Sequence, residues 1–543
     1  MTRNSIAAPS PTVKSDSVLS GPESLPVYSG DWTWIQAAHL LRRMSFAPTY
    51  SEIKQSVEDG LEKTIEKLFA PQPEPELPIN YYFKDDPEVP IGETWIGKKF
   101  TPRINGLLNA RNASLEAWIM GLYLDKPVNV LEKLVLFWHN HLVVSLITPP
   151  NPKWDYYSLL RKYALGDFKA LMKEITINSA MLIYLNGDQN TAKSPNENYA
   201  RELLELFTIG KGPLIGPGDY TNYTENDIQE IARALTGWGI NRRDDKVTFS
   251  ERKHDTGTKQ LSEHFGNATI PNLGEEEYKK VIDIIFEQDE VARFISRQLY
   301  IWYVSSNISE SVERDVIEPM AQILRKNEYH IEPVLRALCQ SEHFFSACNL
   351  GNMIKSPIDY TAMLFRTGNV DLPDNLLEKY PYWFAFSRAV NRLDQRPFYL
   401  PSVAGWQAYY QEPVYYRYWL SSVSLTQRHD LTSQLVRRRL RGRGLRNAGM
   451  DLLGLIAVFD HPEDPNALIR QLSLLFMPFA LTDEQYDFLK TDILIPGLPD
   501  YEWTEEYGNF IDNPKDENLR KAVLSRLESL MEVMFGMAEN QLM

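Results

Sequence analysis

Apolar residues recur every three or four positions along most of this chain, a spacing that places them on one face of an α-helix. It predicts helices over residues 107–124, 128–146, 155–163, 167–178, 195–209, 224–237, 275–287, 289–305 and 310–326, and helical spacing continues over 331–367, 421–490 and 517–540. Strand-type alternation is scarce, and residues 247–250 (VTFS) predict at most a short strand or an extended loop. We therefore expect an all-α fold, a large irregular multi-helix body with long loops and at most minor β-structure.

The helical spacing lapses where connections are expected. Residues 1–30 are rich in serine and proline and predict a disordered N-terminal arm. Residues 71–91 are acidic and proline-rich, and residues 491–516 also predict a loop. After the arm we expect a helical core domain over 31–380 and an aromatic-rich, helical C-terminal region over 381–543. This region should pack on the core, because its aromatic segment, residues 398–419, needs cover from solvent.

Charge and composition exclude several classes of function. The 543 residues include 57 Lys and Arg against 72 Asp and Glu, a formal net charge of −15. We expect no nucleic-acid ligand, because neutralising phosphates needs a basic surface. Two cysteines are too few for a disulfide scaffold or a multi-cysteine metal cluster. No apolar run reaches the about 20 residues that span a bilayer, and no signal peptide is visible, so a cytoplasmic protein is expected.

Two histidines stand in an apolar stretch, in the run Phe137-Trp138-His139-Asn140-His141. Residues two apart on a helix point about 200° away from each other. His139 and His141 can therefore share one metal ion only where the helix ends or the backbone is extended. Two interpretations stay open: at least one histidine ligates a metal, or each makes a separate structural hydrogen bond.

The segment 194–210 predicts a well-delimited helix. Ser194 suits the N-cap, Pro195 the first helical position and Gly210 the C-cap, while Glu197 would complete a capping box. A second helix start lies at Thr224, which can cap its helix together with Asp227 three residues later.

The polar face of the first of these helices carries the candidate catalytic residues Asn198, Arg201, Glu202 and Glu205. Ion pairs between residues four apart would make it an ordinary solvated face. Alternatively, it lines a polar cavity in which Glu202 and Glu205 act as acid–base groups or metal ligands. No lysine occurs between 196 and 209, and Arg201 is suited to bridging two carboxylates. We expect these four side chains to point inward, toward His139 or His141.

Three further segments could carry chemistry. His254 and Asp255 lie in an irregular, Gly- and Thr-rich stretch and are candidate metal ligands. The aromatic segment 398–419 could stack against sugars or a protein partner, although core or interface packing is the simpler interpretation. The arginine-rich run 436–446 predicts either an anion-binding patch or a charged helix end that pairs with acids.

Several of these segments together resemble a family known as domain of unknown function 1800. The motifs that carry the resemblance are FWHNH (137–141), NENYARELLELFTIG (196–210), IARALTGW (231–238), HDTGTK (254–259), KSP (355–357) and PSVAGW (401–406). The resemblance covers the chain from about Trp32 onward and implies no established activity. Its members are often bacterial and exported, which makes export the alternative to a cytoplasmic location.

Polar residues are concentrated in these motifs, so we expect His139, His141, His254, Asn198, Arg201, Glu202, Glu205 and Arg233 to converge on one buried centre. The leading hypothesis is a hydrolase-like enzyme in which His139, His141, His254 and Asp255 hold Zn²⁺, Mn²⁺ or Fe²⁺ and a glutamate acts as general base. The alternative is a non-catalytic assembly or surface-associated protein, with the same residues in a buried structural network. A protein partner, self-association or a polysaccharide ligand is expected.

Overall fold

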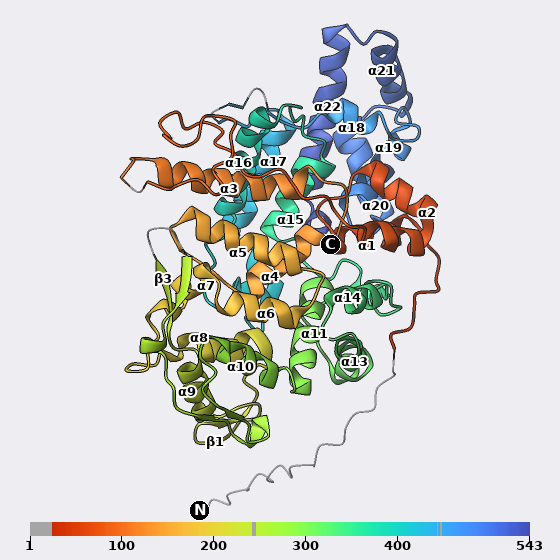
Figure 1. Ribbon diagram of the computed structural model, residues 1–543. Helices are drawn as coiled ribbons and strands as arrows, with labels where there is room; N and C mark the ends of the chain where they lie inside the picture. Colours follow the sequence, from red (N-terminus) through yellow and green to blue (C-terminus); the bar gives the residue numbers. More distant parts are fainter. Residues whose placement is uncertain (1–23, 102, 242–245, 443, 446–447) are drawn as a thin grey trace, which may run out of the picture.

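The structure is a computed structural model that describes residues 24–101, 103–241, 246–442, 444–445 and 448–543. Helices dominate this part of the chain (Figure 1). The first part contains α1 (Trp34–Met44), α2 (Tyr50–Leu68), α3 (Leu107–Leu124), α4 (Leu131–His141), α5 (Pro150–Tyr163), α6 (Phe168–Thr176), α7 (Ser179–Tyr184), α8 (Glu197–Glu202) and α9 (Glu225–Ala234). The middle contains α10 (Glu277–Ile285), α11 (Asp289–Tyr303), α12 (Glu310–Val312), α13 (Glu318–Lys326), α14 (Ile331–Cys339), α15 (Pro357–Ala362) and α16 (Leu376–Arg392). The last part contains α17 (Ser422–Val436), α18 (Leu452–Ile456), α19 (Pro465–Phe476), α20 (Asp483–Phe488), α21 (Tyr501–Asp512) and α22 (Glu517–Gly536).

Apart from isolated bridges, the β-structure of the described residues consists of three antiparallel two-stranded sheets. They pair β1 (Leu214–Gly216) with β2 (Asp219–Tyr220), β3 (Trp238–Asn241) with β4 (Lys246–Phe249), and β5 (Lys259–Gln260) with β6 (Thr269–Ile270). The strand considered at 247–250 is thus β4. The prediction of an all-α fold with minor β-structure is confirmed.

Local capping signals set several helix starts. Thr224 and Asp227 form the predicted capping box of α9. The start of α8 differs from the prediction, because Asn196, not Ser194, is the N-cap. The backbone before it is held in a turn: the amide of Asn196 donates to Oδ1 of Asn190 over 2.8 Å. This tertiary bond moves the helix start beyond Pro195.

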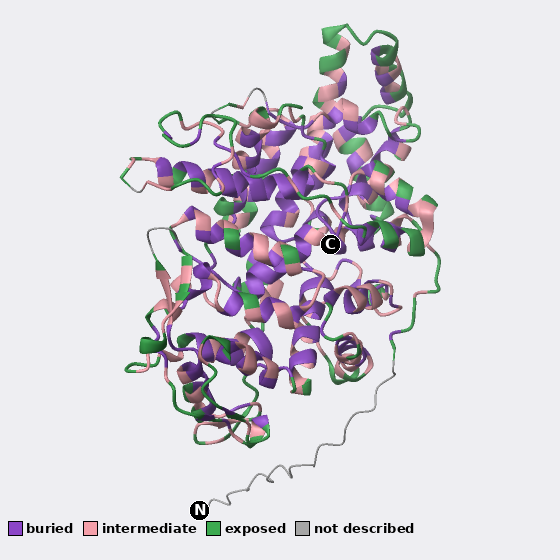
Figure 2. Ribbon diagram, viewed as in Figure 1, coloured by how far each residue is buried: buried purple, intermediate pink, exposed green. Residues whose placement is uncertain are grey.

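One continuous apolar core runs from Leu25 to Phe535 (Figure 2). The predicted boundary at 380 cuts through α16, which packs along α3. The contact is close, since a Cβ on Gly121 would lie 2.6 Å from the ring of Trp383. Trp34 of α1 also donates a hydrogen bond to the carbonyl of Leu474 at 3.1 Å. The C-terminal region therefore shares its core with the rest of the chain.

A half-buried arginine and a buried lysine join α1 and the KSP motif to the end of α19. Arg42 donates to the carbonyls of Leu474 and Leu475 at 2.7 and 2.9 Å. Lys355 of the KSP motif donates to the carbonyl of Phe476 at 3.0 Å. Carbonyls at a helix C-terminus lack intrahelical partners and carry partial negative charge. These contacts explain how cationic side chains are stable in the core, and they give Lys355 a structural role.

The N-terminal arm is partly packed on the body. Residues 1–23 of the predicted arm lie outside the described residues. In residues 24–30, the side chain of Leu25 is buried, and the amide of Tyr28 donates to the carbonyl of Gln340 over 2.8 Å. Apolar side chains among the serines and prolines thus anchor the end of this segment.

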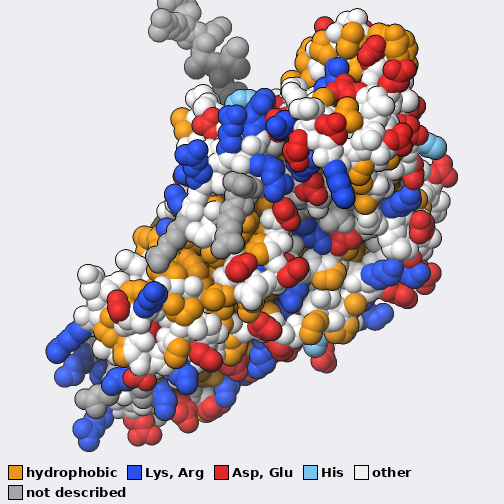
Figure 3. Space-filling view, turned by 90° about the horizontal axis from the view of Figure 1, so that it is seen from above, with side chains coloured by type: hydrophobic (Ala, Val, Ile, Leu, Met, Phe, Trp, Pro, Cys, Tyr) orange, Lys and Arg blue, Asp and Glu red, His pale blue; other side chains and the backbone are white. Residues whose placement is uncertain are grey.

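The predicted loop over 491–516 is wrong, because it contains α21. Trp503, Tyr507 and Phe510 form a helical stripe that is buried against α22. Acidic residues and Gly508 lie between these apolar residues, so the helical spacing is not recognised in the sequence. The hairpin of α21 and α22 projects from the body (Figure 1), and Figure 3 looks down on that side of the molecule.

The arginine-rich run ends α17. Arg437 pairs with Glu532 of α22 at 2.6 Å and with Glu528 at 3.3 Å, as expected for a charged helix end. Arg443 and Arg446 lie outside the described residues.

Among the described residues, no helix combines the length and the apolar character needed to cross a membrane.

Candidate functional site

The motif helix begins as an α-helix and ends as a π-helix. After α8, residues Leu203–Thr208 form a π-helical turn, in which the amide of Ile209 donates to the carbonyl of Leu204 over 3.2 Å. Such turns often occur at functional sites, because they redirect side chains. Gly210 then closes the helix with a φ of 69°, a conformation that favours glycine. A Cβ on Gly210 would lie 2.9 Å from the ring of Phe294, so α11 approaches closely here.

The polar face of α8 lies against the start of α9. Arg201 pairs with Glu225 at 2.7 Å, with Glu197 at 3.2 Å and with Glu205 at 3.4 Å. Its side chain is 32% exposed, and Asn198 is exposed. Within the described residues, no hydrogen bond or ion pair joins this face to His139 or His141. The structure therefore shows a half-exposed ion-pair face where an inward one was expected.

The two candidate acid–base residues differ in their surroundings. Glu205 accepts a hydrogen bond from Tyr223 at 2.6 Å and lies 3.4 Å from Nζ of Lys211. Glu202 is half-buried and makes no hydrogen bond or ion pair within the described part of the chain. Burial and the nearby Glu205 carboxylate raise the pKa of Glu202, against an opposing effect of Arg201.

Both ring nitrogens of His139 form hydrogen bonds to protein groups. Its Nε2 accepts from the amide of Phe398 at 2.9 Å, so the proton resides on Nδ1. Nδ1 then donates to the hydroxyl of Tyr156 at 3.0 Å, which donates onward to the carbonyl of Leu142 at 2.7 Å. Burial lowers the pKa of His139 to about 3. The ring has no free lone pair for a metal.

His141 points to a different part of the core. Its Nε2 donates to the carbonyl of Phe207 at 3.0 Å, and its ring stacks on Phe137. Burial lowers its pKa to about 4. The two histidines thus face apart, as expected for residues two apart on a helix, and His141 anchors α4 to the π-helical turn.

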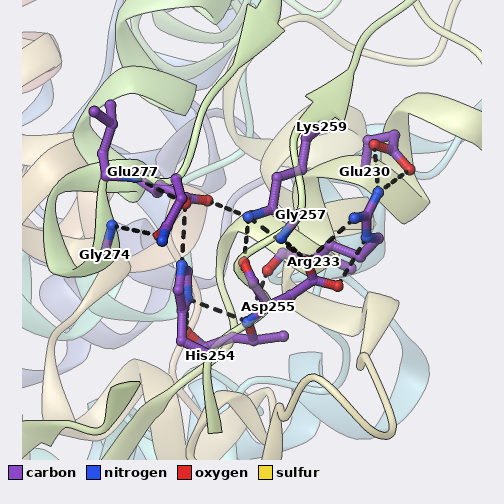
Figure 4. Close-up of polar contacts among 12 residues, drawn as sticks. Glu230, Arg233, His254, Asp255, Gly257, Lys259, Gly274 and Glu277 are labelled. Carbon is purple, nitrogen blue, oxygen red and sulfur yellow. Dashed lines mark hydrogen bonds and ion pairs between the residues drawn. The ribbon is translucent and has the colours of Figure 1, made fainter. Parts of the chain in front are cut away.

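His254 belongs to a buried ion cluster (Figure 4). Its Nδ1 donates to the carbonyl of Thr236 at 2.9 Å, and its Nε2 lies 3.0 Å from Oε1 of Glu277. Both ring nitrogens of His254 are therefore bonded to protein groups. Lys259 lies 2.7 Å from the other oxygen of Glu277, and both side chains are fully buried.

Asp255 turns to the opposite side of this cluster (Figure 4). It pairs with Nε of Arg233 at 2.9 Å and accepts from the amide of Gly257, also at 2.9 Å. The Arg233 guanidinium holds the pKa of Asp255 below its usual value, against an opposing effect of burial. Arg233 also pairs with Glu230 at 2.8 Å. The HDTGTK motif is thereby fixed to α9 and α10 by ion pairs and hydrogen bonds.

The structure does not gather the expected metal ligands. His139 and His141 point apart, while His254 and Asp255 bind other protein groups. Among the described residues, no three His, Cys, Asp or Glu side chains are arranged to hold a metal ion. These residues do not fit the proposed Zn²⁺, Mn²⁺ or Fe²⁺ site.

A large cleft opens beside the end of the motif helix, with a volume of about 760 Å³. It lies where three distant parts of the chain meet: the segment after the π-helical turn, α11, and the aromatic segment. Its lining includes Ile209, Gly210, Lys211, Asn222, Glu290, Phe294, Arg297, Gln298, Asn307, Tyr409, Tyr410, Glu412 and Tyr415.

Tyrosines form one wall of this cleft. Tyr409 stacks on Trp302 of α11, with ring centroids 4.2 Å apart. Tyr410 is 37% exposed, and Tyr415 donates to the carboxylate of Glu412 at 2.7 Å. By contrast, Trp406 and Trp419 are buried, which confirms core packing for that part of the aromatic segment.

The rest of the lining combines fixed charges with side-chain amides. Arg297 is held by Glu290 and Glu313, each at 2.6 Å. The side-chain amides of Gln298 and Asn307 make no hydrogen bond within the described residues. Asn222 donates to the carbonyls of Ile209 and Gly210 at 3.0 and 3.1 Å, which fixes the cleft beside the motif helix.

Sequence reasoning missed the contribution of α11. The residues Phe294, Arg297 and Gln298 carry no local motif, and their spacing is typical of any amphipathic helix. Only the packing of α11 beside Gly210 places them in the cleft.

The chain matches the family described as "Protein of unknown function (DUF1800)" over residues 39–497 and belongs to that family. The matched region includes all the motifs described above. No curated protein and no solved structure was found to match the chain.

Proposed function

We propose that this protein binds a carbohydrate chain in the cleft between the motif helix, α11 and the aromatic segment. The observation that carries the proposal is the pairing of a tyrosine wall with a wall of charged and amide groups. A sugar ring has apolar C–H faces that pack on aromatic rings, and hydroxyls around its edge that bond to planar polar groups.

The shape of the cleft supports an extended ligand. It is open to solvent and does not enclose its contents, so a chain can continue beyond it. Its volume of about 760 Å³ lies within the usual range for ligand sites, about 300–1,000 Å³. The acidic overall charge disfavours a polyanion in the same place.

The surrounding networks support a preformed site. Asn222 and the π-helical turn hold the segment after the motif helix, and Glu290 and Glu313 hold Arg297. Side chains that are already fixed lose little conformational entropy when a ligand binds.

Hydrolysis of the bound chain is the second candidate function, because the cleft holds two carboxylates, Glu290 and Glu412. Glycoside hydrolysis generally uses such a pair, one as general acid and the other as nucleophile or general base. Neither role needs a metal ion.

The test is calorimetric titration with defined hexasaccharides of glucose, xylose and N-acetylglucosamine. Tyr410→Ala should weaken binding about fivefold, since a stacked ring contributes on the order of 1 kcal/mol. Tyr418→Ala is the matched control, because Tyr418 is 44% exposed but does not line the cleft. If no hexasaccharide binds, or if Tyr410→Ala binds as tightly as the native protein, the proposal fails.

The same mixtures, analysed for shorter products, separate the two functions. A hydrolase should release them, and Glu412→Gln should stop the release while binding persists. Binding without products supports the binding protein alone.

A further inference from the structure

The hairpin of α21 and α22 lies beyond the region that matches the family. The family match ends at residue 497, and α21 begins at Tyr501. The outer part of the hairpin projects from the molecule (Figure 1), while the C-terminal half of α22 packs into the core through side chains such as Leu530 and Phe535.

The hairpin is nevertheless firmly held at its base. Trp503 is fully buried and donates to the carbonyl of Pro462 at 2.9 Å. Arg526 of α22 pairs with Glu506 of α21 at 2.6 Å. A projecting element with fixed internal contacts presents a defined surface.

The outer face of α21 is partly apolar and otherwise acidic. Tyr501 and Ile511 are 58% and 54% exposed, and Glu505 and Asp512 are exposed on the same side. Gly508 lies between them, and a Cβ there would meet no atom within 4 Å. Exposed aromatic and aliphatic side chains around an open glycine form a face onto which another surface can pack closely.

A complementary groove lies on the same chain. It has a volume of about 470 Å³ and runs between the segment 81–91 and α16, where Tyr82, Ile91 and Phe384 line it. Within the described part of the chain, the charged side chains that line it are Lys84 and Arg388, both cationic and both exposed. Figure 3 shows hydrophobic side chains gathered in patches bordered by charged ones on the side from which the hairpin projects.

We propose that the outer face of α21 docks into this groove on a second copy of the chain. Tyr501 and Ile511 would pack on Tyr82 and Phe384, while Glu505 and Asp512 would face Lys84 and Arg388. Each copy carries both surfaces. Two copies related by a two-fold axis can therefore each place the outer face of α21 in the groove of the other, which forms both contacts. The charge complementarity within one sequence favours a second copy over an unrelated partner.

The test is sedimentation equilibrium of the full chain at low and high salt. A dimer is expected that weakens as salt rises. The double variants Glu505→Arg/Asp512→Arg and Lys84→Glu/Arg388→Glu should each weaken it by at least about tenfold. The quadruple variant, which exchanges the charges, should restore it. The control Lys193→Glu/Lys253→Glu changes two exposed lysines away from both surfaces and should leave the dimer intact.

Three results would overturn the proposal. The native protein could remain monomeric at all concentrations. A dimer could persist unchanged in both charge-reversal variants, which would place the contact elsewhere. The quadruple variant could stay monomeric although it folds like the native protein, which would show that the two surfaces do not meet.

Discussion

The imidazole of His139 accepts a hydrogen bond from the backbone amide of Phe398, 2.9 Å away and 259 residues further along the chain. The bond ties the FWHNH motif on α4 to the aromatic segment that forms one wall of the cleft. An amide can only donate, so His139 must remain unprotonated at Nε2. The most conspicuous candidate metal ligand of the sequence is thus a neutral structural acceptor.

Replacing this acceptor should destabilise the fold. His139→Ala leaves a cavity and a buried amide without a partner, at a cost of about 2–4 kcal/mol. Urea denaturation measures this loss, and His461→Ala, at a side chain that is 78% exposed, should change stability by less than about 0.5 kcal/mol. If His139→Ala removes a stoichiometric metal at unchanged stability, the structural role is refuted.

Acid should destabilise the protein below the ordinary histidine pKa. Burial lowers the pKa values of His139 and His141 from 6.5 to about 3 and about 4. Between pH 6.5 and 4 the unfolded chain therefore binds more protons than the folded one, and the stabilisation present above pH 6.5 is lost as pH falls. Each histidine should contribute a slope of about 1.4 kcal/mol per pH unit.

The free energy of unfolding at a series of pH values measures this slope. In His141→Gln, the glutamine amide can still donate to the carbonyl of Phe207, but it does not titrate. This variant should therefore lose the part of the slope that His141 contributes, about 1.4 kcal/mol per pH unit. Equal slopes in the native protein and the His141→Gln variant would contradict the prediction.

The buried cluster around Glu277 should depend on its shared counterion. Glu277→Gln removes the charge that faces both Lys259 and His254, and a stranded buried charge costs about 3–5 kcal/mol. Glu276→Gln is the neighbouring control, since its pair with Lys279 is exposed and should contribute about 0–1 kcal/mol. Thermal and urea unfolding measure the loss of stability in both variants. Equal losses in free energy of unfolding would argue against a cluster that holds the HDTGTK motif.

Arg201→Ala should lower the stability of the protein less than the loss of a buried ion pair would. Because 32% of the Arg201 side chain is exposed, solvent screens its attraction to the three neighbouring carboxylates. We therefore expect the variant to lose about 1 kcal/mol in free energy of unfolding. Arg314→Ala, at a single pair that is more exposed, serves as the control and should lose less. A loss of about 3–5 kcal/mol would restore the idea of a buried centre on this face.

Local spacing was sufficient for most helices because it depends on neighbours in the sequence. The predicted helix 107–124 is α3, and the pattern over 224–237 contains α9 with its capping box. The opposed directions of His139 and His141 also follow from helical geometry alone. Apolar spacing did not predict α21, because acidic residues and a glycine separate its apolar residues Trp503, Tyr507 and Phe510.

Apolar periodicity and the motifs were enough to predict the all-α class, most helix positions and the family. That the motif residues do not share one centre became visible only in the packed fold. Arg201 turns to Glu225, His139 to Phe398 and His254 to Glu277, and each of these partners lies on another element. The cleft arises in the same way, since Gly210, Arg297 and Tyr410 meet only after three segments pack together. The physical reason is that periodicity fixes which face of a helix is polar, whereas long-range packing selects the partner that each polar group meets.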